Sequence, residues 1–348
     1  ALGFHAELSG LYTDEFITSS PLFARNGWDS RYPEIENATQ PYQALHVARQ
    51  QGETTVRIIN ELPDVPQKDL KLATAYAYIG SALTVLGENF CEMAIDQGLA
   101  LKPADVLKLA EDRFTSAITS ATAAGSAGVD ILNWARVGRA RVRLQLGNSA
   151  GALSDAQAVP PRFVKNATYD ATPTRRANNL VTANVNTREI SVDPLFRGLK
   201  LQGVVDTRLV AVNTGLKGHD GQTQAWITTK FPNLASPIRV ASWEEAQLII
   251  AEAAGGQEAV AAINRLRNAA PGGALPNFSS TQAGAIRAEW LEERRRILFG
   301  EGRRLGDILR YPEFEFQQGA NHRGVVYSAS MTCFPLPSQE RNANPNIP

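Results

Sequence analysis

Two glutamates are the best candidates for acid–base chemistry in this sequence. Glu244 and Glu252 stand on a stretch expected to be helical, residues 242–254. A retaining glycosidase needs two carboxyl groups roughly 5 Å apart across a cleft, whereas the apolar neighbours of this pair indicate packing. The motifs of zinc proteases, serine hydrolases and nucleotide-binding loops are absent. We therefore expect no catalytic residue and no enzyme activity, and glycosidase remains only as the enzyme alternative.

Metal, cofactor and nucleic-acid binding are not expected either. The two cysteines lie far apart and the four histidines are scattered, so no ligand cluster is visible. The 35 basic residues balance 35 acidic ones, whereas nucleic-acid binders normally carry a basic excess. The sequence also lacks a run of about 18 consecutive apolar residues, so we expect no segment of this chain to span a membrane.

Aromatic side chains beside short polar groups could bind sugars, because a flat ring stacks on the ring of the sugar and polar groups bind its hydroxyls. Trp28 lies in an expected loop with Asp29, Arg31 and Tyr32. We predict a glycan platform there, the alternative being that Trp28 plugs the loop onto the helices. Trp226, in an expected strand, is the second candidate. The remaining tryptophans stand among apolar residues on expected helices and are assigned to the core: Trp134, Trp243 and Trp290.

The first part of the chain, residues 1–160, must supply the scaffold for these side chains. Apolar residues recur there at helical spacing. The stretch 131–158 has the small–large pattern of a tetratricopeptide helix pair, so we expect stacked helical hairpins. The expected helices cover residues 1–20, 42–62, 67–89, 103–124, 131–146 and 150–158.

The composition changes after residue 160. Residues 161–241 are richer in Thr, Asn, Val and Gly and predict a loop-rich excursion with short strands near 209–213 and 224–230. Helices resume at Ser242, a good N-cap, and residues 242–348 are expected to form a helical region packed on the first. The fold class is thus mainly α, in three regions of one compact unit.

The stretch 288–311 holds two helical pieces hinged at Gly300-Glu301-Gly302. An apolar stripe faces one way, and charges of both signs stand four residues apart on the other faces, as Glu292 and Arg296 do. A packing helix with many salt bridges would show the same pattern.

This stretch resembles the signature helix of the RagB/SusD family of bacterial surface nutrient-binding lipoproteins, E-R-x-x-E-L-x-x-E-G-x-R-x-x-D-L-x-R-W. It departs from the pattern at Ile297 and conservatively at Ile308 and Tyr311. The closing segment, Cys333-Phe334-Pro335-Leu336-Pro337 followed by Asn344-Pro345-Asn346, resembles the end of the same family. The structural signature residues that match are Glu293, Arg294, Glu301, Gly302, Arg304, Asp307 and Arg310.

The resemblance implies tetratricopeptide-like hairpins and a non-catalytic role. A protein of this family would capture a glycan or another oligomeric nutrient and pass it to a TonB-dependent transporter of the SusC type. It would sit at the extracellular face of an outer membrane, held by a lipid on a cysteine upstream of this chain, which we expect to begin inside a longer precursor. A structural or assembly role, with the helical repeats as a protein-binding surface, stays open and would allow self-assembly.

Two residue-level expectations follow from the resemblance. Taken alone, the two cysteines could be buried free thiols or a disulfide. The family's closing segment returns to the helical body, which favours a disulfide between Cys91 and Cys333. We also expect Glu301 and Arg304 to be buried and hydrogen-bonded within the C-terminal helical region, where they would fix the turn at Gly300–Gly302.

Overall fold

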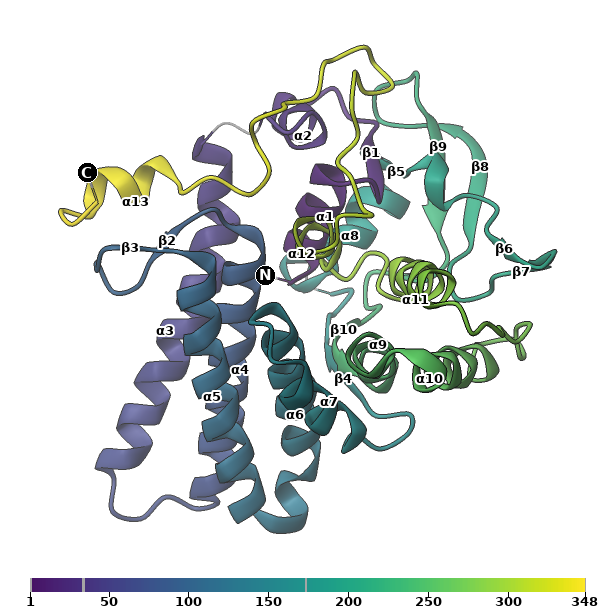
Figure 1. The fold of residues 1–348 in the computed structure, drawn as a ribbon. Coiled ribbons are helices and arrows are strands. Elements are labelled where there is room, and N and C mark those ends of the chain that lie inside the picture. The colour runs from purple at the N-terminus through teal and green to yellow at the C-terminus, as the bar shows by residue number, and fades with distance from the viewer. Residues whose placement is uncertain (1, 33–34, 173, 348) are drawn as a thin grey trace.

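The computed structural model describes residues 2–32, 35–172 and 174–347 and is mainly α-helical, as predicted (Figure 1). Long antiparallel helices form one side of the molecule, and most of the shorter helices and strands form the other. The helices of the first part are α1 (Leu2–Tyr12), α2 (Phe23–Asp29), α3 (Thr39–Glu61), α4 (Lys68–Asn89), α5 (Pro103–Ala123), α6 (Val129–Gln145) and α7 (Ser149–Gln157). The later helices are α8 (Asn179–Val181), α9 (Trp243–Ala254), α10 (Gly256–Asn268), α11 (Ala283–Ile297), α12 (Arg304–Arg310) and α13 (Ser338–Ala343).

The helices α3 to α7 form successive hairpins, the arrangement expected of tetratricopeptide-like repeats. Each packs mainly against its neighbour in sequence, and α4 lies between α3 and α5 and packs against both. Of the described helices, only α4 is long and apolar enough to cross a membrane, and 67% of that stretch is buried inside the protein. This burial is typical of the central helix of a helical core.

The strands are short and pair in twos, all antiparallel. The β4–β10 pair connects the helical array to the C-terminal part, because β10 leads directly into α9. Ser242 is the N-cap of α9, and its hydroxyl accepts a hydrogen bond from the Glu245 backbone amide. The pairs are β1 (Phe16–Thr18) with β5 (Ile190–Val192), β2 (Met93–Ala94) with β3 (Ala100–Leu101), β4 (Val164–Ala167) with β10 (Ile238–Ser242), β6 (Lys200–Leu201) with β7 (Val204–Val205), and β8 (Ala211–Lys217) with β9 (Gln224–Thr228).

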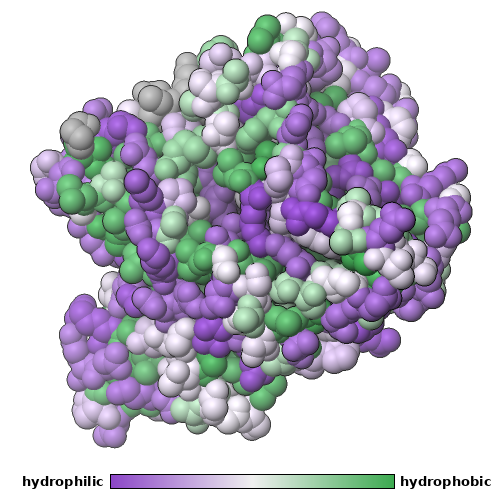
Figure 2. All heavy atoms as spheres, in the orientation of Figure 1, coloured by the Kyte–Doolittle hydropathy of each residue, from purple (hydrophilic) through white to green (hydrophobic). Residues whose placement is uncertain are grey.

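One large hydrophobic cluster runs through the helical array, the middle excursion and the C-terminal helices. The excursion is tied in at its ends: β5 pairs with β1 near the N-terminus, and β9 lies beside β5. The helix α9 packs on α6 and α7. The surface in Figure 2 mixes hydrophilic and hydrophobic residues over the whole visible face.

Two local predictions about the N-terminal segment were wrong. The first helix ends at Tyr12 rather than near residue 20, because Phe16–Thr18 leaves helical geometry to pair with β5. The segment around Trp28, expected to be a loop, forms the short helix α2 (residues 23–29). In both places tertiary contacts override a local pattern that covers only a few residues.

Candidate functional site

The signature stretch forms the hinge that was predicted, between α11 and α12. Gly300 and Gly302 have positive φ angles of 68° and 70°, and a Cβ atom on Gly302 would lie 2.9 Å from the ring of His5. Glycine is therefore required at Gly302, both by its conformation and by the close approach of α1. This turn brings Arg303 next to His5.

Glu301 and Arg304 are buried, but their partners lie outside the C-terminal helices. Glu301 accepts hydrogen bonds from Lys230 (2.8 Å) and from Nε of Arg239 (2.7 Å), both in the middle excursion. Arg304 donates two hydrogen bonds of 2.6 Å to Asp14 at the end of α1. The expectation of bonding within the C-terminal region was thus wrong, because these ion pairs join three distant parts of the chain.

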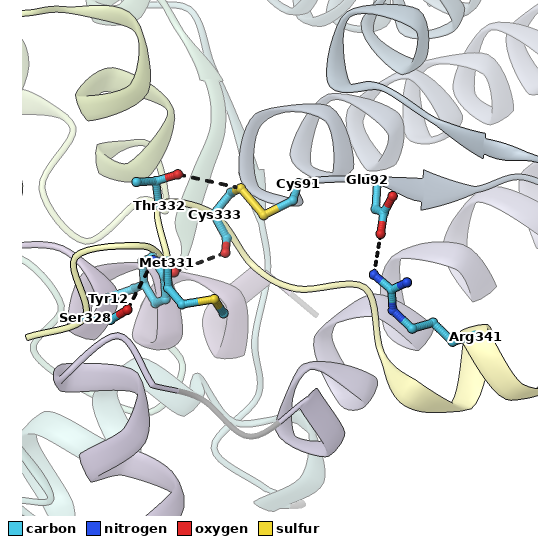
Figure 3. The surroundings of a disulfide bond; sticks show 8 residues. All are labelled: Tyr12, Cys91, Glu92, Ser328, Met331, Thr332, Cys333 and Arg341. Atoms are coloured by element: carbon cyan, nitrogen blue, oxygen red, sulfur yellow. Dashed lines mark hydrogen bonds and ion pairs between the residues drawn. A yellow bond between two sulfur atoms is a disulfide. The ribbon is translucent and has the colours of Figure 1, made fainter. Parts of the chain in front are cut away.

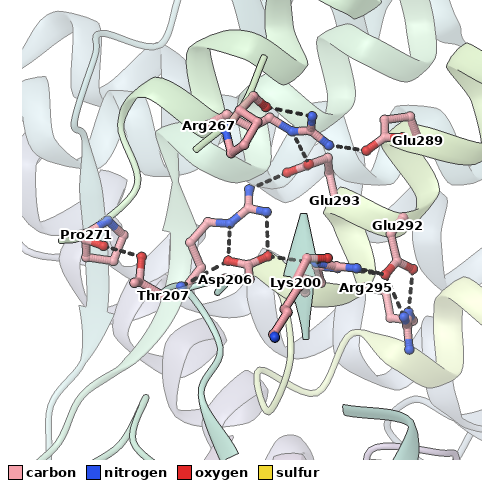
Figure 4. A network of polar contacts seen from close by, with 12 residues as sticks. Lys200, Asp206, Thr207, Arg267, Pro271, Glu289, Glu292, Glu293 and Arg295 are labelled. Atoms are coloured by element: carbon pink, nitrogen blue, oxygen red, sulfur yellow. Dashed lines mark hydrogen bonds and ion pairs between the residues drawn. The ribbon is translucent and has the colours of Figure 1, made fainter. Parts of the chain in front are cut away.

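The other signature residues also serve the structure rather than a reaction. Arg294 is paired with Asp307 at 2.8 Å. Glu293 is fully buried and is held by Arg267 and Arg208, within the network of ion pairs drawn in Figure 4. Arg310 pairs with Glu252.

That network holds the segment around β6 and β7 to α10 and α11. Asp206, which follows β7, is fully buried and bonds to Arg208 at 2.8 Å and Arg296 at 3.1 Å. Glu292 bonds to both Arg295 and Arg296 one turn further along α11. The three consecutive arginines of this helix, Arg294 to Arg296, are therefore all paired with carboxylates.

The glutamate pair weighed for catalysis is occupied by structural contacts. Glu252 accepts a hydrogen bond from the Tyr311 hydroxyl (2.6 Å) and one from Arg310. Glu244 lies 3.6 Å from Arg239. In the described part of the chain we also find no group of three or more residues placed to hold a metal ion.

The disulfide expected between Cys91 and Cys333 is present, with Cα atoms 5.2 Å apart (Figure 3). Beside it, Cys91 donates a backbone hydrogen bond to the Phe334 carbonyl, and Phe334 donates one to the Asn89 carbonyl. The closing segment is therefore held to the end of α4 by a covalent bond and by backbone pairing.

The proposed Trp28 platform is corrected by the structure. Trp28 is only 2% exposed and packs against Phe334 and Tyr12, with ring centroids 4.6 and 5.9 Å away. Asp29 and Arg31 are equally buried. A ring enclosed in this way cannot stack on a ligand, so the alternative holds and Trp28 plugs its segment onto the core.

The polar neighbours of Trp28 are buried because the C-terminal loop supplies their partners. Asp29 accepts a hydrogen bond of 2.7 Å from Asn321, and burial raises the pKa of Asp29 to about 7. Arg31 donates to the Gln317 carbonyl at 2.7 Å and stacks over the Tyr327 ring. Tyr32 alone of the four remains exposed, at 57%.

We expect Trp28→Ala to lower the free energy of unfolding by about 3 kcal/mol, the low end for loss of a large aromatic side chain from a core. Urea denaturation followed by circular dichroism measures the change. Tyr32→Ala, at the exposed neighbour, is the control and should change stability by less than about 0.5 kcal/mol. If the Trp28 variant is as stable as the parent protein, Trp28 does not contribute to the core and its assignment as a core residue is wrong.

Trp226 lies half-buried on β9, whereas Trp28 is enclosed on α2. The Arg197 guanidinium covers one face of its ring, 4.8 Å from the ring centroid. Its cross-strand neighbour is the exposed Asn213, which accepts a hydrogen bond from Gln224. The structure therefore does not bring the two tryptophan candidates into one site.

A cavity of about 340 Å³ opens where the helical array meets the C-terminal part, and we call it the α4–α6 cavity. Tyr78, Ser81, Ala82 and Val85 recur at helical spacing and place one face of α4 on it. Its remaining walls come from α1, α3, α5, α6, the β4–β10 pair, α9 and the start of α12. Such a size lies at the lower end for ligand pockets, which measure about 300–1,000 Å³.

Trp134, Gly138 and Arg141 recur at helical spacing on α6 and form the facing wall. Trp134 meets Tyr78 edge-on, with ring centroids 4.9 Å apart. A Cβ atom on Gly138 would lie 2.3 Å from the Phe114 ring, so glycine is needed to let that ring reach the cavity. The rim is exposed at Tyr78, while Trp134 is 2% exposed.

The deepest wall of the cavity is polar. His5, Glu245 and Arg303 are each less than 5% exposed. Burial, reinforced by the Arg303 charge, lowers the pKa of His5 to about 3, and burial raises the pKa of Glu245 to about 8. At neutral pH the imidazole is therefore uncharged. Glu245 lies within ion-pair distance of two arginines, 3.5 Å from Arg303 and 3.9 Å from Arg141.

Two further charged side chains that line the cavity are paired with carboxylates. Arg141 donates a hydrogen bond of 2.6 Å to Glu88. Lys165 pairs with Asp130 at 2.5 Å and holds its ammonium group 5.3 Å from the Trp134 ring centroid.

The sequence analysis missed this cavity because its walls come from many elements, and it assigned Trp134 to the core. The signal that could have pointed to it is the set of aromatic and small residues at helical spacing on α4 and α6.

Neither a family model nor a curated protein matches this sequence. Solved structures do match, over almost the whole chain. A SusD-like carbohydrate-binding protein from Bacteroides vulgatus superposes with a TM-score of 0.76 at 15% identity, covering 99% of this chain and 91% of the other. This chain has the SusD-like fold.

Two further structures extend the likeness to the SusD-like fold. A surface glycan-binding protein A from Bacteroides uniformis gives a TM-score of 0.77 at 12% identity, covering 99% of this chain and 93% of the other. A laminarin-binding SusD-like protein gives 0.65 at 13% identity, with coverage of 99% and 93%. The signature hinge and the closing segment, which indicated a SusD-like fold from sequence, thus occur in a chain that has this fold over its full described length.

Proposed function

We propose that this protein is a SusD-like nutrient-binding protein of the cell surface. It captures a glycan or another oligomeric nutrient and passes it to a TonB-dependent transporter of the SusC type, without catalysing a reaction. The observation that carries the proposal is the match of 99% of the chain to SusD-like structures described as carbohydrate- or glycan-binding. The protein then lies at the extracellular face of an outer membrane, anchored by a lipid on a cysteine that precedes this chain.

Three features of the molecule support the proposal. The α4–α6 cavity combines aromatic walls with converging polar groups, as small-molecule sites do. The ionisable residues of the signature stretch are held in ion pairs, so they build a rigid scaffold rather than a reactive centre. A disulfide between the only two cysteines suits an oxidising compartment outside the cytoplasm.

A panel of neutral and acidic oligosaccharides tests the proposal, first on an array and then by calorimetry, with chromatography of the incubated sugars. We expect at least one glycan to bind and none to be cleaved. Release of shorter products would instead indicate a glycosidase. Binding of no sugar, together with self-assembly of the purified protein, would favour the structural role. A TonB-dependent transporter gene beside the gene for this chain would support the transport partnership.

Trp226 remains the surface candidate for ligand contact. If it stacks on a bound glycan, Trp226→Ala should weaken binding by about 1–3 kcal/mol, as loss of an aromatic hot-spot residue does, without changing the helical circular dichroism. Leu216→Ala removes an exposed apolar side chain from the same hairpin and is the matched control. Equal affinity of the Trp226 variant and the parent protein would remove Trp226 from the site.

A further inference from the structure

A groove between α3 and α4 continues from the α4–α6 cavity, and we call it the α3–α4 groove. It measures about 680 Å³ and shares two wall residues with the cavity, Ala48 and Tyr78. Because α3 and α4 are antiparallel neighbours (Figure 1), the wall residues of the groove recur at helical spacing in opposite directions along the two helices. They include Ala48, Gly52 and Thr55 on α3, and Tyr78, Ala75 and Lys71 on α4. Cavity and groove are therefore successive parts of one hollow, which we call the α3–α4 seam.

Tyr78 stands where the two parts of the seam meet. It is 55% exposed, whereas the other large aromatic rings of the cavity, Phe114 and Trp134, are buried. Trp134 meets Tyr78 edge-on and supports its ring from below the surface. An exposed aromatic ring can lie against the apolar face of a sugar. Tyr78 is thus an aromatic residue of the seam that a ligand can reach.

Short uncharged polar side chains stand on both sides of Tyr78, and all of them are exposed or half-buried. They are Ser81, Asn166 and Thr168 in the cavity, and Gln51, Thr55 and Thr74 in the groove. The hydroxyls of Ser81, Thr55 and Thr74 each donate to a backbone carbonyl one turn earlier, and their lone pairs can still accept from a ligand. A few polar groups on a mostly apolar wall are typical of small-molecule sites.

The charges around the seam favour a neutral ligand. The arginine and lysine side chains of the cavity each face a carboxylate: Arg141 and Glu88, Lys165 and Asp130, Arg303 and Glu245. Of the described residues that line the groove, only Lys71 carries a charge, and it is exposed to solvent. A ligand charge placed in the cavity would have to compete for a carboxylate or an arginine that is already paired, and an unpaired buried charge is costly.

The inner end of the cavity is closed. His5, Glu245 and Arg303 form its deepest wall and are each less than 5% exposed, so a chain cannot pass between them. The cavity, at about 340 Å³, has half the volume of the groove. A protein helix with its side chains is about 10–12 Å across, which is too wide for this space. The seam therefore fits the end of a narrow, extended chain.

We propose that the α3–α4 seam binds a neutral oligosaccharide by one of its ends. The terminal sugar lies in the outer part of the α4–α6 cavity, beside Ser81 and β4. The next sugar lies against Tyr78, and the following units lie along the α3–α4 groove. This assignment rests on the proposed function and adds to it a site, the charge class of the ligand and the direction in which the chain enters.

Calorimetry with laminarihexaose, maltohexaose, mannohexaose and xylohexaose tests the site. We expect the parent protein to bind at least one of them, and Tyr78→Ala to weaken that binding by roughly tenfold or more, as loss of an aromatic hot-spot residue does. Tyr32→Ala is the matched control, because Tyr32 is 57% exposed and lines neither the cavity nor the groove. It should bind like the parent protein.

Two bulky substitutions on α4 block the two parts of the seam separately. Ser81→Tyr fills the cavity and Thr74→Tyr fills the groove, and both positions are half-buried. Each should weaken the hexasaccharide by roughly tenfold or more. Ser116 is half-buried on α5, bonds in the same way to the Asp112 carbonyl and lies outside the seam, so Ser116→Tyr is the control. Circular dichroism shows whether each variant folds, and the Tyr78→Ala result decides if a blocking variant does not.

Binding by the end also fixes the stoichiometry on a polymer. With the soluble polysaccharide that matches the bound hexasaccharide (laminarin, amylose, mannan or xylan), we expect one protein molecule per chain. Many protein molecules on each chain would show that the glycan is held along its length, and this would overturn the closed cavity as the end of the path.

The outcomes separate the site from the function. Weaker binding in Tyr78→Ala, Ser81→Tyr and Thr74→Tyr, with both controls unchanged, supports the seam. Equal affinity of both blocking variants and the parent protein overturns the seam and leaves the proposed function intact. A loss in Thr74→Tyr alone overturns the cavity part, and a loss in Ser81→Tyr alone overturns the groove part.

The ligand class is decided by a further probe. Binding of tetragalacturonic acid, but of none of the neutral hexasaccharides, overturns the neutral class while the proposed function stands. If neither the acidic nor the neutral glycans bind the parent protein, the proposed function fails and this inference fails with it.

Discussion

Glu301→Ala is expected to lower the free energy of unfolding by about 3–5 kcal/mol, the range for breaking one side of a buried ion pair. Glu301 is 1% exposed and accepts hydrogen bonds from Lys230 and Arg239. Both cations also donate to the carbonyl of Ile297, the last residue of α11, and Lys230 donates to the Phe299 carbonyl in the turn that follows. Without the carboxylate, Arg239 keeps only the longer pair with Glu244 at 3.6 Å, and Lys230 keeps only backbone carbonyl groups as hydrogen-bond partners.

The variant should also loosen the excursion. Lys230 and Arg239 belong to the segments that lead into and form β10, so their release should raise hydrogen exchange in residues 228–240. Glu313→Ala is the control, because Glu313 pairs with Arg287 at the surface, where both side chains are more than 40% exposed. Surface pairs contribute about 0–1 kcal/mol. A Glu301 variant no less stable than the Glu313 variant would show that the buried pair does not stabilise the hinge.

The signature stretch shows which part of this region could be predicted from sequence. Two helical pieces and a hinge at Gly300–Gly302 follow from spacing and from glycine, and both occur. The pair Glu292–Arg296 also follows, because the two residues lie one turn apart on the same helix. The partner of Arg304 does not follow, since Asp14 is 290 residues away and no local pattern connects them.

Trp28 illustrates the same limit at the candidate site. A tryptophan among short polar residues in a loop has the local signature of a sugar platform. Its polar neighbours are instead satisfied by Asn321, Gln317 and Ser328 of the C-terminal loop. Burial depends on which distant segment covers a residue, and one sequence does not contain that information.

The α4–α6 cavity could be predicted even less. Its aromatic wall residues have the spacing of ordinary core positions, and its polar residues come from α1, α9 and the hinge. Each looks unremarkable in its own segment. They become a candidate site only because the hinge at Gly302 brings the start of α12 close to α1. A Cβ atom on residue 302 would clash with the His5 ring and prevent this approach.

The disulfide is the other feature on which a large effect is expected. Replacing both cysteines by serine opens a covalent loop that spans 242 residues in sequence. Chain entropy alone gives about 5 kcal/mol for a loop of this length, and measured losses for disulfides are commonly about 2–4 kcal/mol. We therefore expect the double variant Cys91→Ser, Cys333→Ser to lose about 2–5 kcal/mol of stability in urea.

The loss should appear in global stability more than in the native position of the closing segment. Phe334 is fully buried, with its ring centroid 4.6 Å from that of Trp28 and 5.4 Å from that of Phe90, and its backbone pairs with Asn89. These contacts remain when the sulfurs are removed, so the folded state changes little, while the unfolded chain gains freedom. Parent protein unfolded in the presence of a reductant should therefore match the double variant, and the reductant should not affect the variant. If the double variant unfolds at the same urea concentration as the oxidised parent, the bridge adds nothing beyond the packing of Phe334.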